Sequence, residues 1–80
     1  MAVISVRTFE TESGKEVPAT GLRTGSAEAA AEQAILLNTL YAAPGYITKI
    51  FYSGDFVDPA FAELTQLVQR HGLNLEIGGV

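Results

Sequence analysis

The pattern of hydrophobic and polar positions along the chain predicts four strands and two helices. Residues 2–9 alternate in side-chain character and are rich in β-branched residues, which is typical of a strand. The polar segment 10–15 contains Ser-Gly and predicts a turn. Residues 15–22 are then expected to return as a second strand. Pro18 places this strand at a sheet edge, because proline cannot donate a hydrogen bond to a ladder.

Residues 27–42 are rich in strong helix formers and predict a helix that follows an N-cap at Ser26 and ends before Pro44. Ile35 falls among the polar residues of this helix, where a monomer does not need an apolar side chain. Ile35 is therefore a candidate contact with a partner. At helical spacing, the expected apolar face comprises Ala30, Ala34, Leu36, Leu37, Leu40 and Tyr41.

The second half of the chain predicts a strand, a helix and a last strand. Residues 45–51 carry apolar side chains on both faces, as a central strand does. Asp58 followed by Pro59 is a strong start signal for a helix, and Gly72 suits the left-handed position that ends it. Residues 73–77 alternate strictly between apolar and polar side chains and predict the final strand.

This ββαβαβ order predicts a single α+β domain over residues 1–80. We expect a two-layer sandwich with two helices packed on one face of a three- or four-stranded mixed sheet. Hydrophobic residues make up 48% of the chain and charged residues only 18%, which argues against disorder and for one small core. The expected core comprises Val6, Leu37, Leu40, Phe51, Leu64, Leu67, Val68 and Leu75.

The composition and the motifs argue against most kinds of catalytic chemistry. The chain has no cysteine and one histidine, His71, which is expected to pack at the end of the second helix. The loop 20–26 lacks the lysine of a phosphate-binding loop, and no serine lies in a GxSxG sequence. Asp55 and Asp58 do not follow the EF-hand pattern. We therefore predict a non-enzymatic protein with no catalytic residue, no cofactor and no metal site.

The chain has no 18-residue apolar run and no basic leader, so we expect a cytoplasmic protein without a membrane segment. Its net charge is −4, and its five bases are dispersed along the sequence, which disfavours direct nucleic-acid binding. Glu10, Glu12 and Glu16 instead gather around the predicted turn. They suggest an acidic hairpin that contacts a basic protein.

Aromatic residues complete the predicted docking surface. Tyr46 and Tyr52 share one face of the central strand, and a two-layer domain leaves one face of its sheet without a helix. Aromatic side chains on an uncovered face are typical anchors of a protein interface. The expected partner-binding residues are Glu10, Glu12, Glu16, Ile35, Tyr46 and Tyr52.

The primary functional hypothesis is a protein-interaction module, an inhibitor or adaptor that docks through an open sheet face and an acidic hairpin. One specialisation is an inhibitor of a nucleic-acid-handling protein, of the kind that phages encode and that acts in the host cytoplasm. A small homodimeric enzyme or ligand-binding protein with a pocket between sheet faces is the alternative. A structural subunit of a larger assembly is the third reading. These three hypotheses differ in what covers the apolar surface that the core does not use: another protein, a second copy of the chain, or a ligand.

Overall fold

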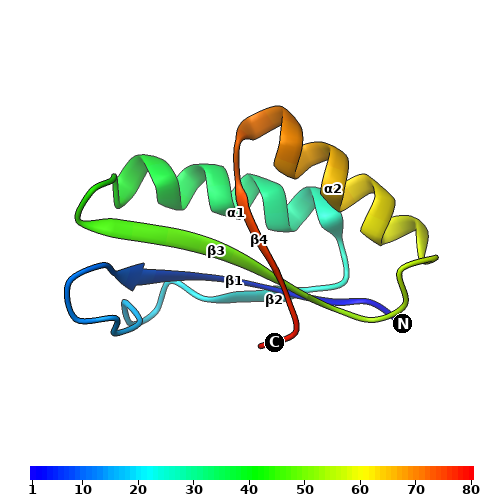
Figure 1. Cartoon of the computed structure of the whole chain (residues 1–80), viewed down its shortest axis with the longest axis horizontal. Coiled ribbons are helices and arrows are strands. Elements are labelled where there is room, and N and C mark those ends of the chain that lie inside the picture. The colour runs from blue at the N-terminus through cyan, green and yellow to red at the C-terminus, as the bar shows by residue number, and fades with distance from the viewer.

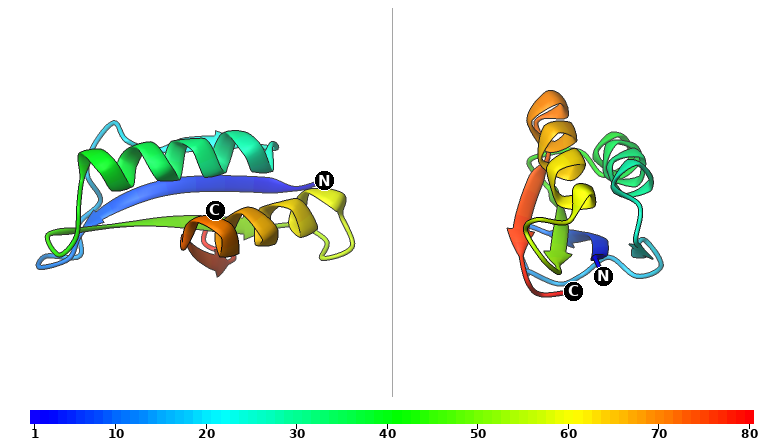
Figure 2. Two further views of the ribbon diagram at one scale, coloured as in Figure 1. Left: turned by 90° about the horizontal axis from the view of Figure 1, so that it is seen from above. Right: turned by 90° about the vertical axis from the view of Figure 1, so that its right-hand side faces the viewer.

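The computed structural model describes residues 1–80 and consists of a four-stranded sheet with two helices on one of its faces (Figure 1). Its elements are β1 (Val3–Glu10), β2 (Leu22–Thr24), α1 (Ala27–Leu40), β3 (Tyr46–Ser53), α2 (Pro59–His71) and β4 (Asn74–Ile77). The predicted ββαβαβ order and two-layer α+β architecture are confirmed. Figure 2 shows the two helices side by side above the sheet. Neither helix has the length and hydropathy needed to cross a bilayer.

The strands lie in the order β2-β1-β3-β4. β1 is antiparallel to both of its neighbours, and β3 and β4 are parallel because α2 carries the chain back between them. The second strand is an edge strand, as expected, but it begins only at Leu22. The expected strand over residues 15–22 is wrong, since a single bridge between Phe9 and Glu16 is all that forms there. Pro18 cannot donate to β1, and Ala19 turns the backbone to a φ of 63°, which no strand tolerates.

The register between β1 and β3 decides which side chains lie beneath the helices. Ile4, Val6 and Thr8 of β1 are directly opposite Tyr52, Ile50 and Thr48 of β3, and all six are buried. The buried hydroxyls of Thr8 and Thr48 form a hydrogen bond of 2.7 Å with each other. The alternate residues of both strands therefore occupy the open face.

Helix α1 packs on the sheet through small side chains. Its buried residues are Ala27, Ala30, Ala31, Ala34 and Leu37. Alanines let the helix axis approach the strands closely, and of the large aliphatic side chains of α1 only Leu37 is buried. Leu36 and Leu40 are 51% and 64% exposed, so the expectation that Leu40 belongs to the core is wrong.

Helix α2 contributes one fully buried residue, Leu64, while Leu67, Val68 and Leu75 of β4 are half-buried. Val6, Leu37 and Phe51 are buried as predicted. Phe51 is on the open face, where the chain end at Gly79 covers it; a Cβ at Gly79 would lie 3.0 Å from the Phe51 ring.

The ends of both helices follow local signals. The Ser26 side chain accepts a hydrogen bond from the Ala29 amide at 3.2 Å, and Asp58 accepts one from the Ala60 amide at 2.9 Å. Pro59 is the first residue of α2, and Gly72 ends this helix in the left-handed conformation with a φ of 63°. These predicted caps are confirmed.

Tyr52 is the clearest correction to the predicted docking surface. It is fully buried beneath the helices, so it is not an exposed anchor. Its ring centroid lies 4.7 Å from that of Phe61, and its hydroxyl donates a hydrogen bond of 2.5 Å to the Asp55 carbonyl. Burial raises the pKa of Tyr52 above its usual value, and the carboxylates of Asp58 and Asp55 raise it further. The helices cover the Ile50/Tyr52 face of β3, which leaves the opposite face open.

Replacement of Leu64 by alanine tests the packing of α2. Because Leu64 is fully buried, Leu64→Ala should lower the free energy of unfolding by about 2–5 kcal/mol. The matched substitution Leu40→Ala, on the exposed side of α1, should cost less than about 0.5 kcal/mol. Denaturant titration measures both values, and equal losses would contradict the described rotation of α1.

The raised pKa of Tyr52 predicts a loss of stability in alkali. The folded protein keeps the hydroxyl proton at a pH where the unfolded chain has released it, so the free energy of unfolding falls as the pH rises through about 10. Tyr52→Phe should be less stable by about 1 kcal/mol at pH 7, because it lacks the hydrogen bond to Asp55. It should also lose stability less steeply above pH 10. Thermal unfolding from pH 8 to 11 checks this, and parallel curves for the two proteins would contradict it.

Candidate functional site

A groove lies between the two helices, and Ile35 is the one exposed large aliphatic residue of α1 that lines it. This helical groove has a volume of about 360 Å³. Its lining residues are Glu28, Ala31, Glu32, Ile35, Glu63, Leu67, Arg70 and His71.

Helical periodicity brings these residues to facing sides of α1 and α2. Glu28, Glu32 and Ile35 recur at intervals of four and three residues, and so do Glu63, Leu67 and Arg70 in α2, which places each set on one helix face. The residues deepest in the groove are apolar, since Ala31 is buried and Leu67 is half-buried. The charged residues are exposed around them, and Ile35 is 38% exposed beside them.

The carboxylates of the helical groove have no cationic partner. The ion pairs of the chain are Arg7 with Glu16 and Lys49 with Glu76, and both lie on the other side of the molecule. Glu28, Glu32 and Glu63 thus outnumber Arg70, the one fixed cation of the groove. His71 lies in the last turn of α2, as expected, but it is exposed at the groove rather than packed on the apolar side.

The predicted acidic hairpin is an irregular loop between β1 and β2, at the end of the molecule where α1 ends (Figure 1). There Glu10, Glu16 and Tyr46 line one hollow of about 300 Å³. Two of the three predicted carboxylates have partners within the chain: Glu10 accepts a 2.6 Å hydrogen bond from Ser13, and Glu16 lies 3.9 Å from Arg7. Only Glu12 is both exposed and unpartnered.

Tyr46 belongs to the hairpin hollow and not to an open sheet face. It is half-buried, and its ring packs edge-to-face on Tyr41 with the centroids 5.1 Å apart. The structure therefore joins Glu10, Glu16 and Tyr46, and separates them from Ile35 on α1 and from buried Tyr52.

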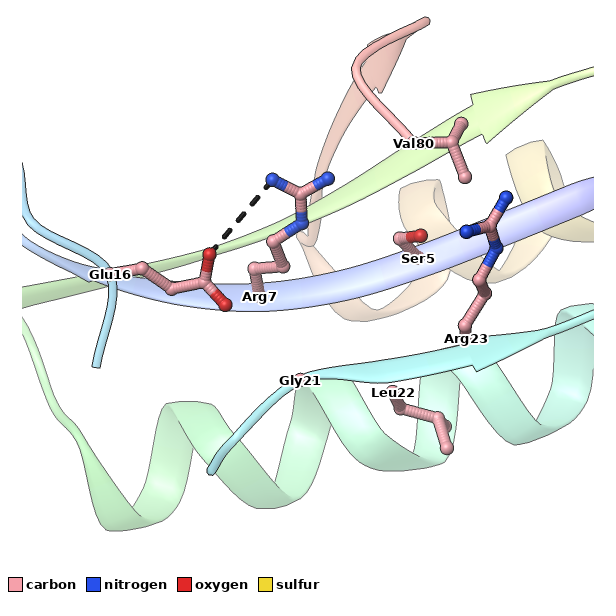
Figure 3. Close-up of a pocket in the computed structure, with 7 residues that line it drawn as sticks. All are labelled: Ser5, Arg7, Glu16, Gly21, Leu22, Arg23 and Val80. Atoms are coloured by element: carbon pink, nitrogen blue, oxygen red, sulfur yellow. Dashed lines mark ion pairs between the residues drawn. The ribbon is translucent and has the colours of Figure 1, made fainter. Parts of the chain in front are cut away.

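The open face of the sheet carries cations that are far apart in the sequence. Arg7 and Arg23 flank Ser5 around a second hollow of about 320 Å³ (Figure 3). This basic hollow is lined by Ser5, Arg7, Glu16, Gly21, Leu22, Arg23 and Val80. The Arg7 guanidinium lies 4.9 Å from the centroid of the Phe51 ring and donates a hydrogen bond to the Gly79 carbonyl. Lys49 stands on the same face, 2.8 Å from Glu76 and 5.8 Å from the Phe9 ring centroid.

The groove glutamates are not singled out in the sequence analysis, and along the sequence the bases are dispersed. The spacing of Glu28 and Glu32 on the same helix side as Ile35 is the signal that could have linked them. The basic hollow left no such signal, because strand pairing alone joins Arg23 to Ser5. No group of three or more histidine, aspartate or glutamate side chains is placed to hold a metal ion.

Comparisons with protein-family models, with curated proteins and with solved structures found no match. The candidate sites of this chain are therefore defined by its own geometry, and the helical groove joins apolar surface to three unpaired carboxylates.

Proposed function

We propose that this protein is a non-enzymatic interaction module that docks a basic amphipathic helix of another protein in the helical groove. One observation carries the proposal: α1 buries four alanines and Leu37 but leaves three other large aliphatic side chains exposed, and one of these, Ile35, lines the helical groove. The fold needs the inner alanines, but it does not need Ile35, Leu36 and Leu40 outside. A contact with a partner gives these exposed side chains a role.

Apolar contact supplies the anchor of the proposed complex. Ile35 lies at the groove, and Ala31 and Leu67 extend the apolar surface inward. A helix that lays an apolar stripe between α1 and α2 would bury these side chains together, in the way that helices bind grooves in other complexes. Such central apolar contacts usually carry most of the binding energy.

Charge selects the partner. Three unpaired glutamates around the groove favour lysine or arginine on the polar edges of the incoming helix. Segments of this kind are common in proteins that handle nucleic acids, because they neutralise phosphates. The proposal therefore retains the role of an inhibitor or adaptor for a basic protein, and it moves the docking surface from the sheet face and the hairpin to the helical groove.

Charge reversal in the groove tests the electrostatic part of the proposal. The probe is a synthetic amphipathic helix with leucines on one face and lysines on the other. Glu28→Lys combined with Glu32→Lys should slow its association about tenfold at 50 mM salt and flatten the salt dependence up to about 300 mM. The matched control is Glu10→Lys with Glu12→Lys, which makes the same charge change at the loop. If the loop pair slows association as much as the groove pair, the groove is not the docking site.

Truncation of Ile35 tests the apolar part. Ile35→Ala should accelerate dissociation of the same peptide about tenfold and leave its association rate nearly unchanged. Leu40→Ala, which truncates a more exposed aliphatic side chain of the same helix away from the groove lining, is the control. Sedimentation of the free protein is measured alongside. A dimer that Ile35→Ala dissociates would favour a second copy as the occupant and would overturn the proposal.

A further inference from the structure

The open face of the sheet concentrates positive charge in an acidic protein. Strand pairing sets Arg23 directly opposite Ser5, and sets Arg7 directly opposite Lys49. Three of the five bases of the chain therefore share this face, whereas the protein as a whole carries a net charge of −4. The basic hollow lies between Arg7 and Arg23 (Figure 3).

This arrangement works against stability. Like charges directly opposite each other on neighbouring strands repel, and Arg7 and Lys49 form such a pair. Lys49 is compensated by Glu76 at 2.8 Å. Arg7 donates a hydrogen bond to the Gly79 carbonyl and lies over the Phe51 ring, but its nearest carboxylate, that of Glu16, is 3.9 Å away, too far for a hydrogen bond. Arg23 is exposed and has no ion-pair partner. Local conflicts of this kind are typical of functional sites.

We infer that the basic hollow binds the phosphate group of a small phosphate ester. Two guanidinium groups approach it from β1 and β2, and their planar forks match phosphate oxygens. Ser5 lies between them and takes part in none of the chain's side-chain hydrogen bonds, so its hydroxyl is free to donate. Donors on three separate side chains suit the tetrahedral oxygens of a phosphate better than the two oxygens of a carboxylate.

A neighbouring hollow indicates that the ligand is an ester rather than the inorganic ion. A space of about 380 Å³ beside the loop after β1 is lined by Phe9, Glu10, Thr11, Gly14, Ile47 and Lys49, of which Phe9, Ile47 and Lys49 stand on the open face. It lies next to the basic hollow, because Lys49 is directly opposite Arg7 in the sheet. A phosphate held by Arg7 and Arg23 would let an attached aromatic group reach the apolar side chains of Phe9 and Ile47.

Binding is tested by NMR titration of the whole chain in phosphate-free buffer at constant ionic strength. The probes are inorganic phosphate, phenyl phosphate and phenol. Phenyl phosphate should shift the amide signals of Ser5, Arg7 and Arg23, and it should bind more tightly than either of the other two probes. Phenol binding as tightly as phenyl phosphate would overturn the phosphate site, and inorganic phosphate binding as tightly would overturn the ester.

Matched variants distinguish a built site from general charge attraction. Arg23→Gln should weaken phenyl phosphate about tenfold, because it removes a charged hydrogen-bond donor. Arg70→Gln makes the same charge change in the helical groove and should leave the affinity unchanged. Equal effects of the two variants would overturn the proposal.

A variant of opposite sign completes the test. Glu16→Gln should strengthen binding, since it removes the carboxylate that competes for Arg7. Circular dichroism shows whether each variant is folded. Weaker binding by folded Glu16→Gln would show that charge does not govern binding at the hollow and would overturn the proposal.

Discussion

The pairing of β1 with β3 is the constraint on which the rest of the structure depends. It runs from Val3 opposite Ser53 to Glu10 opposite Tyr46, so it spans both strands completely. Side chains alternate between faces, and a slip of one residue would therefore exchange the two sets. In the observed register both strands contribute large side chains to the small core. The charged residues Arg7 and Lys49 of the paired region lie on the open face, and only Glu10, at the end of β1, does not. The same pairing that builds the core thus assembles Arg7 with Lys49.

A second constraint follows from the size of the chain. With 80 residues there is one layer of helix, and α1 must cover β1 and β3 closely to exclude water. The alanines of α1 make this approach feasible, and they leave room inside for only one of its larger aliphatic side chains, Leu37. Three large aliphatic side chains of α1 are therefore exposed, as are Phe56 and Val57 in the loop before α2. On the open sheet face, Arg7 and Gly79 contact the Phe51 ring, and Lys49 lies over the Phe9 ring.

Much of the fold follows from local signals that the sequence displays. The helix-capping residues act within one helical turn, so they can be recognised without knowledge of the rest of the chain. They are Ser26, Asp58 with Pro59, and Gly72. The predicted start of the second strand is wrong because nothing in the sequence indicates that Ala19, an alanine, adopts a left-handed backbone conformation. Tyr52 was assigned to the wrong face for a different reason. Alternation separates two faces of a strand, but only tertiary packing decides which of them the helices cover.

The candidate sites were less accessible to prediction than the fold. Ile35 stands out in the sequence as an apolar residue among polar ones, and the structure leaves it 38% exposed at the groove. The proximity of Arg7 to Arg23 depends on contacts between strands, and the position of Glu63 relative to Glu28 depends on the packing of two helices. The spacing of residues within one strand or helix does not predict distances between different elements.

The division of α1 into an inner face of alanines and an outer face of larger residues has an evolutionary consequence. A larger side chain at Ala30 or Ala34 would push the helix from the sheet, so selection for folding acts on the inner positions. Substitutions at Ile35, Leu36 or Leu40 leave the core intact, so these positions are free to change with the partner. Diverged copies of such a chain would keep their alanine spacing and differ in their outer aliphatic residues, and new binding specificities would arise without loss of the fold.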